Sequence, residues 1–166
     1  MWGRPKGLNL PALETRAIDP IAEAEAIVAN MPNPPRISYD GGSQAYYRPM
    51  TDSIHLPARN RFESSSEYYS ALFHELTHST GRRSRLNRHT LETIAPFGSR
   101  VYSEEELCAE FGAAFLCAHA GIQNTIDNSA SYITGWLKKL RSDKKLAIIA
   151  AAKGQKAADY IMDSKA

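Results

Sequence analysis

The chain has 166 residues, of which 43% are hydrophobic and 23% are charged, the ordinary balance of a globular protein. We therefore expect one compact domain with a buried core. The 20 basic and 18 acidic residues give a formal charge of +2 and are spread along the chain, which excludes a basic arm or an acidic tail.

The sequence shows neither a secretory leader nor an apolar run near 18 residues, which argues against export and membrane insertion. Its two cysteines, Cys108 and Cys117, fall in one predicted helix. This spacing puts them about 13 Å apart on opposite faces, too far for a disulfide. We expect a reduced, cytoplasmic protein.

The first 17 residues carry glycines and prolines without a sustained hydrophobic period, so we expect a linker or N-terminal extension at 1–17. The domain itself is assigned to 18–166. Asp19-Pro20 predicts the start of a helix that runs to about Asn30, where a proline-rich segment ends it.

Three short segments with β-branched and aromatic residues follow, at 36–40, 44–48 and 53–56. Turn-forming residues separate them at Asp40-Gly41-Gly42 and at 49–52. This alternation is typical of an antiparallel meander, so we expect a small antiparallel sheet.

The next segment predicts a long helix, with a cap region at 64–67 and a terminating Gly81. Apolar residues recur at helical spacing between these ends. The segment that follows, 81–88, holds four arginines. We interpret it as a solvated loop; the functional alternative is a patch that contacts phosphate groups.

A further helix is predicted to begin at Ser103, which has a glutamate three positions later, and to end at Gly121. It is apolar nearly all round and should be buried. Two C-terminal helices are expected at about 129–140 and 143–162, with Ser142 as the cap between them.

The long helix after the sheet carries the motif His74-Glu75-Leu76-Thr77-His78. Four residues advance a helix by about 400° and 6 Å, so both imidazoles project from one face and can bind one tetrahedral Zn²⁺ at about 2.0–2.1 Å. Glu75 lies beside the metal without binding it. It is the predicted general base, which takes a proton from a metal-activated water and passes it to the leaving group.

A catalytic zinc site needs a third protein ligand, which we assign to Glu106 in the next helix. Glu110 lies one turn further on the same face and is expected to orient a histidine through its outer ring nitrogen. The two roles could be exchanged. Alternatively, Glu104, Glu105 and Glu106 only favour the helix N-terminus through its dipole. A lone Glu110 in an apolar helix still requires a partner.

Three tyrosines, Tyr39, Tyr47 and Tyr102, are candidates for the hydrogen-bond donor to a developing oxyanion, with aromatic packing as the alternative role. In gluzincins, which have this set of ligands, the substrate adds to an exposed edge strand before the motif helix. The segment so placed is Ser53-Ile54-His55-Leu56; an ordinary structural strand is the alternative.

The remaining histidines have weaker claims to function. His55 falls in a predicted strand, His89 in the arginine-rich loop, and His119 near a helix C-terminus, where a cation suits the helix dipole. We expect structural roles for them, although His89 could line the cleft.

Two segments, 68–81 around the motif and 102–112 around Glu106, resemble the C-terminal zincin-like metallopeptidase domain of ArdC-type antirestriction proteins, which plasmids and other mobile elements carry. Further matches are Ile54-His55-Leu56-Pro57 and the segments 131–137 and 156–161. The resemblance therefore covers the chain from about residue 18 onward.

This resemblance implies a metal-dependent domain that helps incoming DNA to escape host restriction, with a protein or peptide substrate and a host restriction component as candidate partners. Family members usually carry an N-terminal domain that binds single-stranded DNA. Because no such domain precedes residues 18–166 in this sequence, the resemblance does not imply DNA binding by this chain alone.

Together these observations predict an α+β zincin-like fold, in which a small antiparallel sheet packs on a helical body. The predicted reaction is hydrolysis of a peptide bond by a zinc-activated water. The alternative is a non-catalytic antirestriction module that binds a restriction enzyme or DNA and has a structural metal site. A metal-dependent nuclease is disfavoured, because nuclease sites usually hold two ions in carboxylate-rich clusters.

Overall fold

The computed structural model describes residues 17–92, 96–123, 141 and 143–163. Residues 1–16 of the extension predicted at 1–17 lie outside these residues, as do the predicted helix at 129–140 and the predicted cap Ser142.

The sheet has three strands in the order β1-β3-β2. They are β1 (Arg36–Tyr39), β2 (Tyr46–Arg48) and β3 (Ser53–Leu56). Strands β2 and β3 are antiparallel, as predicted, but β1 pairs with β3 in parallel, so the prediction of an antiparallel meander is wrong for β1. The connection 40–45 passes to the far side of β3 instead of forming a hairpin. It must span two strand spacings, about 10 Å, which six residues can do.

Strand β3 is therefore the central strand, and the expectation that Ser53-Ile54-His55-Leu56 forms an exposed edge is wrong. The side chains of Ile54 and Leu56 are completely buried in the core, which suits a strand that is paired on both sides. Within the described residues, β1 and β2 are the edges of the sheet.

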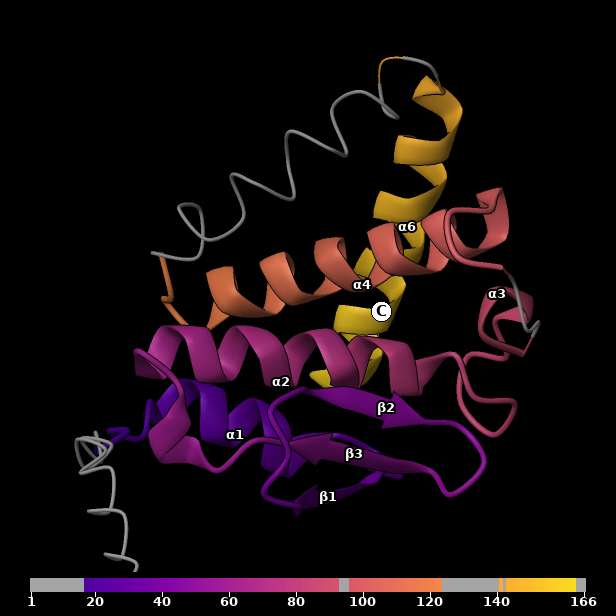
Figure 1. The fold of residues 1–166 in the computed structure, drawn as a ribbon. Helices are drawn as coiled ribbons and strands as arrows, with labels where there is room; N and C mark the ends of the chain where they lie inside the picture. Colours follow the sequence, from indigo (N-terminus) through magenta and orange to yellow (C-terminus); the bar gives the residue numbers. More distant parts are fainter. Residues whose placement is uncertain (1–16, 93–95, 124–140, 142, 164–166) are drawn as a thin grey trace, which may run out of the picture.

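The helices build up the other layers of the molecule (Figure 1). They are α1 (Ala22–Asn30), α2 (Ser65–Thr80), α3 (His89–Glu92), α4 (Arg100–His119) and α6 (Lys144–Ile161), with a 3₁₀ turn η1 (Arg59–Arg61) before α2. Figure 1 shows α2 between the sheet and α4, with α6 crossing both helices. The α+β zincin-like fold is confirmed.

Local interactions define both ends of α2, as predicted. The Ser64 hydroxyl accepts a hydrogen bond from the Glu67 backbone nitrogen at 3.1 Å, and the Glu67 carboxylate accepts one from the Glu63 nitrogen at 2.6 Å. Gly81 ends the helix. The apolar face of α2 is buried in the core through Tyr68, Tyr69, Leu72, Phe73 and Leu76.

Other helix starts differ from the prediction. Helix α4 begins one turn earlier than expected, because Ser99 caps it by accepting a hydrogen bond from the Tyr102 nitrogen at 3.2 Å, and Ser103 is buried inside the helix. The capping position before α1 is occupied by Ile21 and not by the predicted Asp19. Asp143 caps α6 by accepting a hydrogen bond from the Leu146 nitrogen at 3.0 Å.

Glycine permits a close crossing of α4 and α6. A Cβ atom on Gly154 would lie 2.7 Å from the Phe111 Cβ and 2.9 Å from the Gly112 nitrogen, closer than side chains pack. The crossing fixes α4, which carries the predicted third ligand, against the helical body.

The two cysteines are free and buried, and burial raises the pKa of each thiol to about 11. Within the described part of the chain, none of the helices combines the length and the apolar character needed to cross a membrane.

Candidate metal centre

Helices α2 and α4 bring two histidines and one glutamate together. The Nε2 atoms of His74 and His78 are 3.1 Å apart. The Glu106 carboxylate lies 3.7 Å from His74 Nε2 and 3.6 Å from His78 Nε2. These three residues can each offer one ligand atom to a single ion.

The distances suit a tetrahedral cation. Bonds of about 2.0–2.1 Å at tetrahedral angles would hold the ligand atoms about 3.3–3.4 Å apart. The two Nε2 atoms, 3.1 Å apart, are slightly closer than that value. The Glu106 oxygens, Oε2 at 3.7 Å from His74 Nε2 and Oε1 at 3.6 Å from His78 Nε2, are slightly farther. The three side chains therefore fit a divalent cation.

Each histidine also faces a carboxylate through its outer nitrogen. His74 Nδ1 is 3.5 Å from Glu110 Oε1, and His78 Nδ1 is 3.1 Å from Glu105 Oε1. A neutral imidazole has one N–H group, and these carboxylates favour placing it on Nδ1. The two Nε2 lone pairs then converge at 3.1 Å and repel each other unless a cation lies between them.

The three consecutive glutamates of α4 point in three different directions. Glu104 forms an ion pair with Lys153 of α6, Glu105 contacts His78, and Glu106 faces both imidazoles. Successive side chains of a helix diverge by about 100°, which separates the three directions. The helix-dipole interpretation is wrong, because the first turn of α4 contains no acidic residue.

The charges of the site reinforce one another. Burial alone lowers the pKa of His74, but Glu106, Glu75 and Glu110 outweigh it, so the pKa is raised. Burial likewise opposes ionisation of Glu106, yet His74 and His78 hold its pKa below the usual range. The surroundings therefore favour a positive charge at His74 and a negative charge at Glu106, an arrangement in which a bound cation would take the place of the proton.

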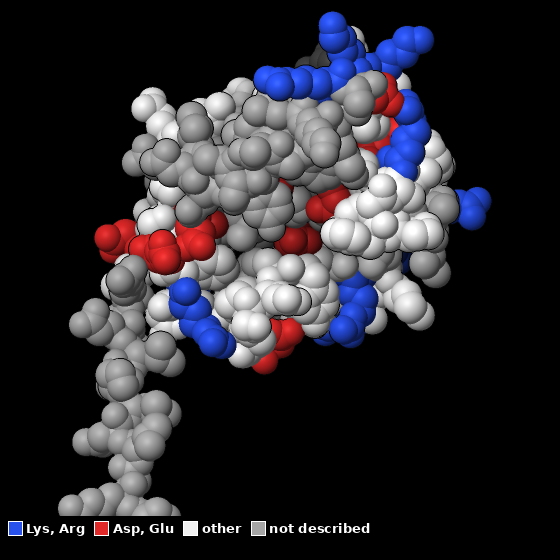
Figure 2. All heavy atoms as spheres, turned by 45° about the horizontal axis from the view of Figure 1, so that its top comes forward, with Lys and Arg blue, Asp and Glu red and all other residues white. Residues whose placement is uncertain are grey.

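A cavity of about 470 Å³ opens at this group. Its wall is formed by Ala45, Tyr46, Tyr47, His74, Glu75, His78, Thr90, Leu91, Tyr102, Glu105, Glu106 and Glu110. Glu75, the predicted base, lies in this wall and is only 8% exposed. Figure 2 shows acidic side chains deep in a hollow of one face, with Lys and Arg side chains further out.

The candidate tyrosines are placed differently. Tyr47 and Tyr102 line the cavity. The Tyr47 hydroxyl, however, donates to Asp52 at 2.8 Å. Tyr39 is not brought to the site: its hydroxyl lies 2.6 Å from that of Tyr68, so its assignment as an oxyanion donor is wrong.

None of the other histidines that the sequence singles out lines this cavity. His55 packs in the sheet, where Nε2 is 3.0 Å from Ser53 Oγ and Nδ1 is 3.2 Å from Asp40 Oδ2, and its ring stacks on Tyr46. His89 begins α3 and His119 ends α4, both at exposed positions.

The arginine-rich loop is not a solvated loop throughout. The Arg85 side chain is 0% exposed and binds both carboxylate oxygens of Asp52 at 2.8 Å. Arg88 is buried against both oxygens of Glu105. These two arginines are committed to internal ion pairs, which leaves Arg82 and Arg83 as the arginines of this loop that border a neighbouring surface hollow.

Sequence reasoning missed Glu105 as the outer partner of His78. Its role depends on the buried Arg88, and a run of arginines after a helix usually indicates solvent. A usable signal was present in the three consecutive glutamates, because their 100° spacing on a helix requires them to find different partners.

Residues 22–154 match a family model described as a zincin-like metallopeptidase, MPTase-PolyVal. The chain therefore belongs to this zincin-like metallopeptidase family. The motif helix and the converging ligands described above agree with that membership.

Within this family the chain is homologous to ArdC antirestriction proteins, which confirms the resemblance. It is 40% identical to the antirestriction ArdC protein from plasmid R388 in its Mn(II)-bound crystal structure, with a TM-score of 0.67, covering 89% of this chain and 52% of that one. For the metal-free crystal structure the identity is 38% and the TM-score 0.64, over 90% and 51% of the two chains.

Curated relatives are longer proteins. Two proteins named DNA primase TraC from Escherichia coli are 40% identical over 126 residues and 37% over 156 residues, covering 76% and 93% of this chain. The matches span only 8% and 14% of those proteins. Uncharacterized protein y4eC from Sinorhizobium fredii is 39% identical over 122 residues, 73% of this chain and 39% of that protein.

Proposed function

We propose that this chain is the zinc-dependent metallopeptidase domain of an antirestriction protein and that it hydrolyses a peptide bond. The observation that carries the proposal is the convergence of His74, His78 and Glu106 beside Glu75 in an open cavity. A closed structural metal site would need neither the cavity nor a carboxylate positioned as a base.

Each side chain at the site has its own role in the proposed hydrolysis. His74, His78 and Glu106 would hold a divalent cation, which would supply Lewis-acid polarisation of the substrate carbonyl and lower the pKa of a bound water. Glu75 accepts the proton of the attacking water at its carboxylate and delivers it to the departing amide nitrogen. Glu105 and Glu110 keep the two imidazoles in the ligand orientation through their Nδ1 atoms.

Tyr102 is proposed as the donor to the developing oxyanion. It lies one helical turn before Glu106 on α4, so both side chains project from the same face, and both line the cavity. Tyr47 is less suitable, because its hydroxyl proton is directed to Asp52.

Strand β2, an edge of the sheet within the described residues, contributes Tyr46 and Tyr47 to the cavity wall. We propose that an extended peptide substrate pairs with this strand instead of β3. Backbone hydrogen bonds would then position the scissile bond beside the histidines.

Two histidines and one carboxylate form the ligand set of many catalytic zinc sites, which supports zinc as the cofactor. The R388 ArdC protein has been crystallised with Mn(II), and manganese fits the same donor types. Tests on this chain should therefore use both metals.

The decisive experiment compares the wild type with Glu75→Gln, each loaded with zinc or manganese, on an unfolded protein substrate analysed by mass spectrometry. We expect the variant to keep the metal and lose peptide cleavage, because glutamine cannot accept the proton. Equal cleavage by both proteins would refute the assignment of Glu75. If neither metal-loaded protein cleaves any substrate, the result favours the non-catalytic module that binds a restriction enzyme or DNA.

A further inference from the structure

We propose that the loop after α2 tunes metal binding, because Arg88 and Thr90 clamp Glu105 and thereby hold His78 in its ligand orientation. Arg88, Thr90 and Glu105 are then positioning residues for the cation. The inference rests on the proposed metal site but does not depend on the proposed reaction.

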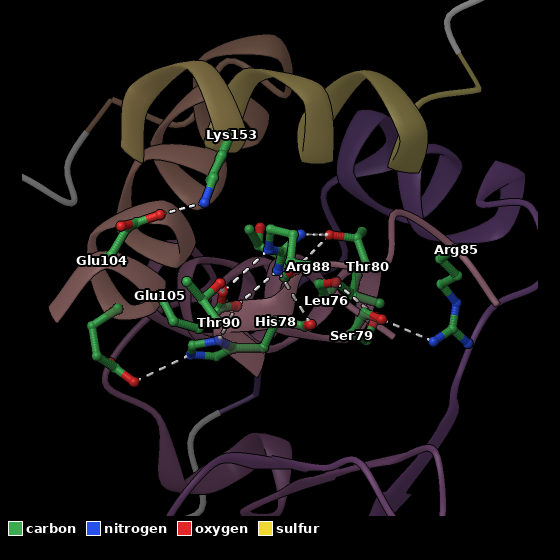
Figure 3. A network of polar contacts seen from close by, with 12 residues as sticks. Leu76, His78, Ser79, Thr80, Arg85, Arg88, Thr90, Glu104, Glu105 and Lys153 are labelled. Carbon is green, nitrogen blue, oxygen red and sulfur yellow. Dashed lines mark hydrogen bonds and ion pairs between the residues drawn. The ribbon is translucent and has the colours of Figure 1, made fainter. Parts of the chain in front are cut away.

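The clamp is a buried carboxylate with donors on both oxygens (Figure 3). Glu105 Oε1 lies 3.1 Å from His78 Nδ1 and accepts from an Arg88 terminal nitrogen at 2.8 Å. Its Oε2 accepts from Arg88 Nε at 3.1 Å and from the Thr90 hydroxyl at 2.5 Å. The side chains of Glu105 and Arg88 are only 7% and 6% exposed, so water cannot easily replace these contacts.

Arg88 ties this carboxylate to the motif helix itself. Its guanidinium also donates to the Thr77 carbonyl at 2.8 Å and to the Thr80 hydroxyl at 2.5 Å. Both acceptors belong to the last turns of α2, next to His78. The position of Glu105 relative to the His78 ring is therefore set by one rigid, planar group, which a lysine cannot imitate.

The two histidines differ in how firmly their outer partners are held. The Glu110 side chain is 38% exposed and lies 3.5 Å from His74 Nδ1. The Glu105 side chain is buried and lies 3.1 Å from His78 Nδ1. Loss of such an outer partner typically weakens metal binding by about 10- to 100-fold. We therefore expect metal affinity to depend mainly on the Glu105 side of the site.

Thr90 connects the clamp to the cavity, because it lines the wall together with Leu91. Any coupling between this loop and the metal must be reciprocal. We expect metal binding to protect the backbone amides of residues 88–91 from hydrogen exchange, a response that a purely structural loop would not show.

The same loop supplies a matched control in Arg85. The Arg85 side chain is also shielded from solvent, binds both oxygens of Asp52, and donates to the Ser79 carbonyl of α2 at 2.9 Å. Among the described side chains, Asp52 contacts Tyr47 and Arg82 besides Arg85, and none of these is a proposed metal ligand. Replacing Arg85 thus perturbs the loop without touching the outer partner of a ligand.

The test measures zinc affinity of the full chain by competition with a chromogenic chelator, and thermal unfolding in EDTA, for Arg88→Lys, Thr90→Val and Arg85→Lys. Arg88→Lys should weaken zinc binding by about 10- to 100-fold. Thr90→Val, which removes one hydrogen bond, should give a smaller change in the same direction. Arg85→Lys should lower the unfolding temperature and leave zinc affinity unchanged.

The other possible results of this test also decide whether the inference holds. Wild-type affinity in both Arg88→Lys and Thr90→Val would overturn the inference and leave the metal site standing. An equal loss of affinity in Arg85→Lys would also overturn it, because general loosening of the loop would explain the effect. If Arg88→Lys does not fold, Thr90→Val decides the question. A wild type that binds neither zinc nor manganese would refute both this inference and the proposed function.

Discussion

Gly112 of α4 lies directly against Thr77 of the His74–His78 motif. A Cβ atom at position 112 would fall 2.5 Å from the Thr77 Cγ2 and 2.6 Å from its Oγ1. The absent side chain lets α4 approach α2 at the level of the two histidines, so the separation of these helices, and with it the reach of Glu106, depends on a glycine in the middle of a helix.

We therefore expect Gly112→Ala to destabilise the fold, although alanine is the better helix former. Overpacking of this kind costs about 1–3 kcal/mol, measured as the free energy of unfolding in urea with EDTA present. Combining it with Thr77→Ala, which removes both clashing atoms, should recover part of the loss, so the two changes should not be additive. Strict additivity would show that the contact is not the cause.

Helix α2 and its motif could be predicted because all the signals are local. The Ser64 and Glu67 cap interactions span a few residues, and the His74 and His78 spacing follows from helix geometry alone. Nothing local distinguished the parallel pairing of β1 with β3 from a hairpin. That choice depends on which strand is buried in the middle of the sheet, which is a property of the whole core.

The carboxylates around the two histidines could likewise be predicted from the sequence only in part. The assignment of Glu106 to the imidazoles and of Glu110 beside His74 could be proposed from a helical repeat. The role of Glu105 could not, because it requires a buried arginine from a loop whose composition indicates solvent exposure.

Tyr102→Phe tests the proposed oxyanion donor. Removing one such hydrogen bond typically lowers kcat by about 10²- to 10³-fold, because the bond is strongest in the transition state. Metal affinity should not change. Tyr39→Phe is the matched control, since the Tyr39 hydroxyl contacts Tyr68 away from the cavity, and it should keep wild-type kcat. A Tyr102→Phe enzyme with unchanged kcat would exclude this role.

The ion pair of Asp52 with Arg85 predicts a contribution to acid stability. Burial alone would raise the pKa of Asp52, but Arg85, Tyr47 and Arg82 outweigh it and hold the pKa below 3.8. A lowered folded-state pKa stabilises the protein above the unfolded-state value, and this stability is lost as the pH falls through the folded-state value.

We expect Asp52→Asn to be less stable than the wild type at pH 6, with the difference shrinking below about pH 4. Urea unfolding at pH 6 and pH 3, in EDTA, measures this change. Glu63→Gln removes an exposed carboxylate and controls for overall charge. A difference between wild type and Asp52→Asn that stays constant over this range would contradict the assigned pKa shift.

Neighbouring glutamates of α4 allow a test of the third ligand. Glu106→Gln removes the carboxylate charge that faces both imidazoles and should weaken zinc binding by more than the 10- to 100-fold expected for loss of an outer partner. Glu104→Gln changes the same residue type two positions earlier, breaks only the ion pair with Lys153, and should bind zinc like the wild type. Isothermal titration calorimetry on both variants, with circular dichroism to verify folding, measures the contrast.

The same measurement on Glu110→Gln tests whether the two carboxylates have exchanged roles. If Glu110→Gln weakens zinc binding more than Glu106→Gln does, Glu110 is the third ligand, and the cation lies nearer to the Glu110 side of His74 than the ring nitrogens indicate.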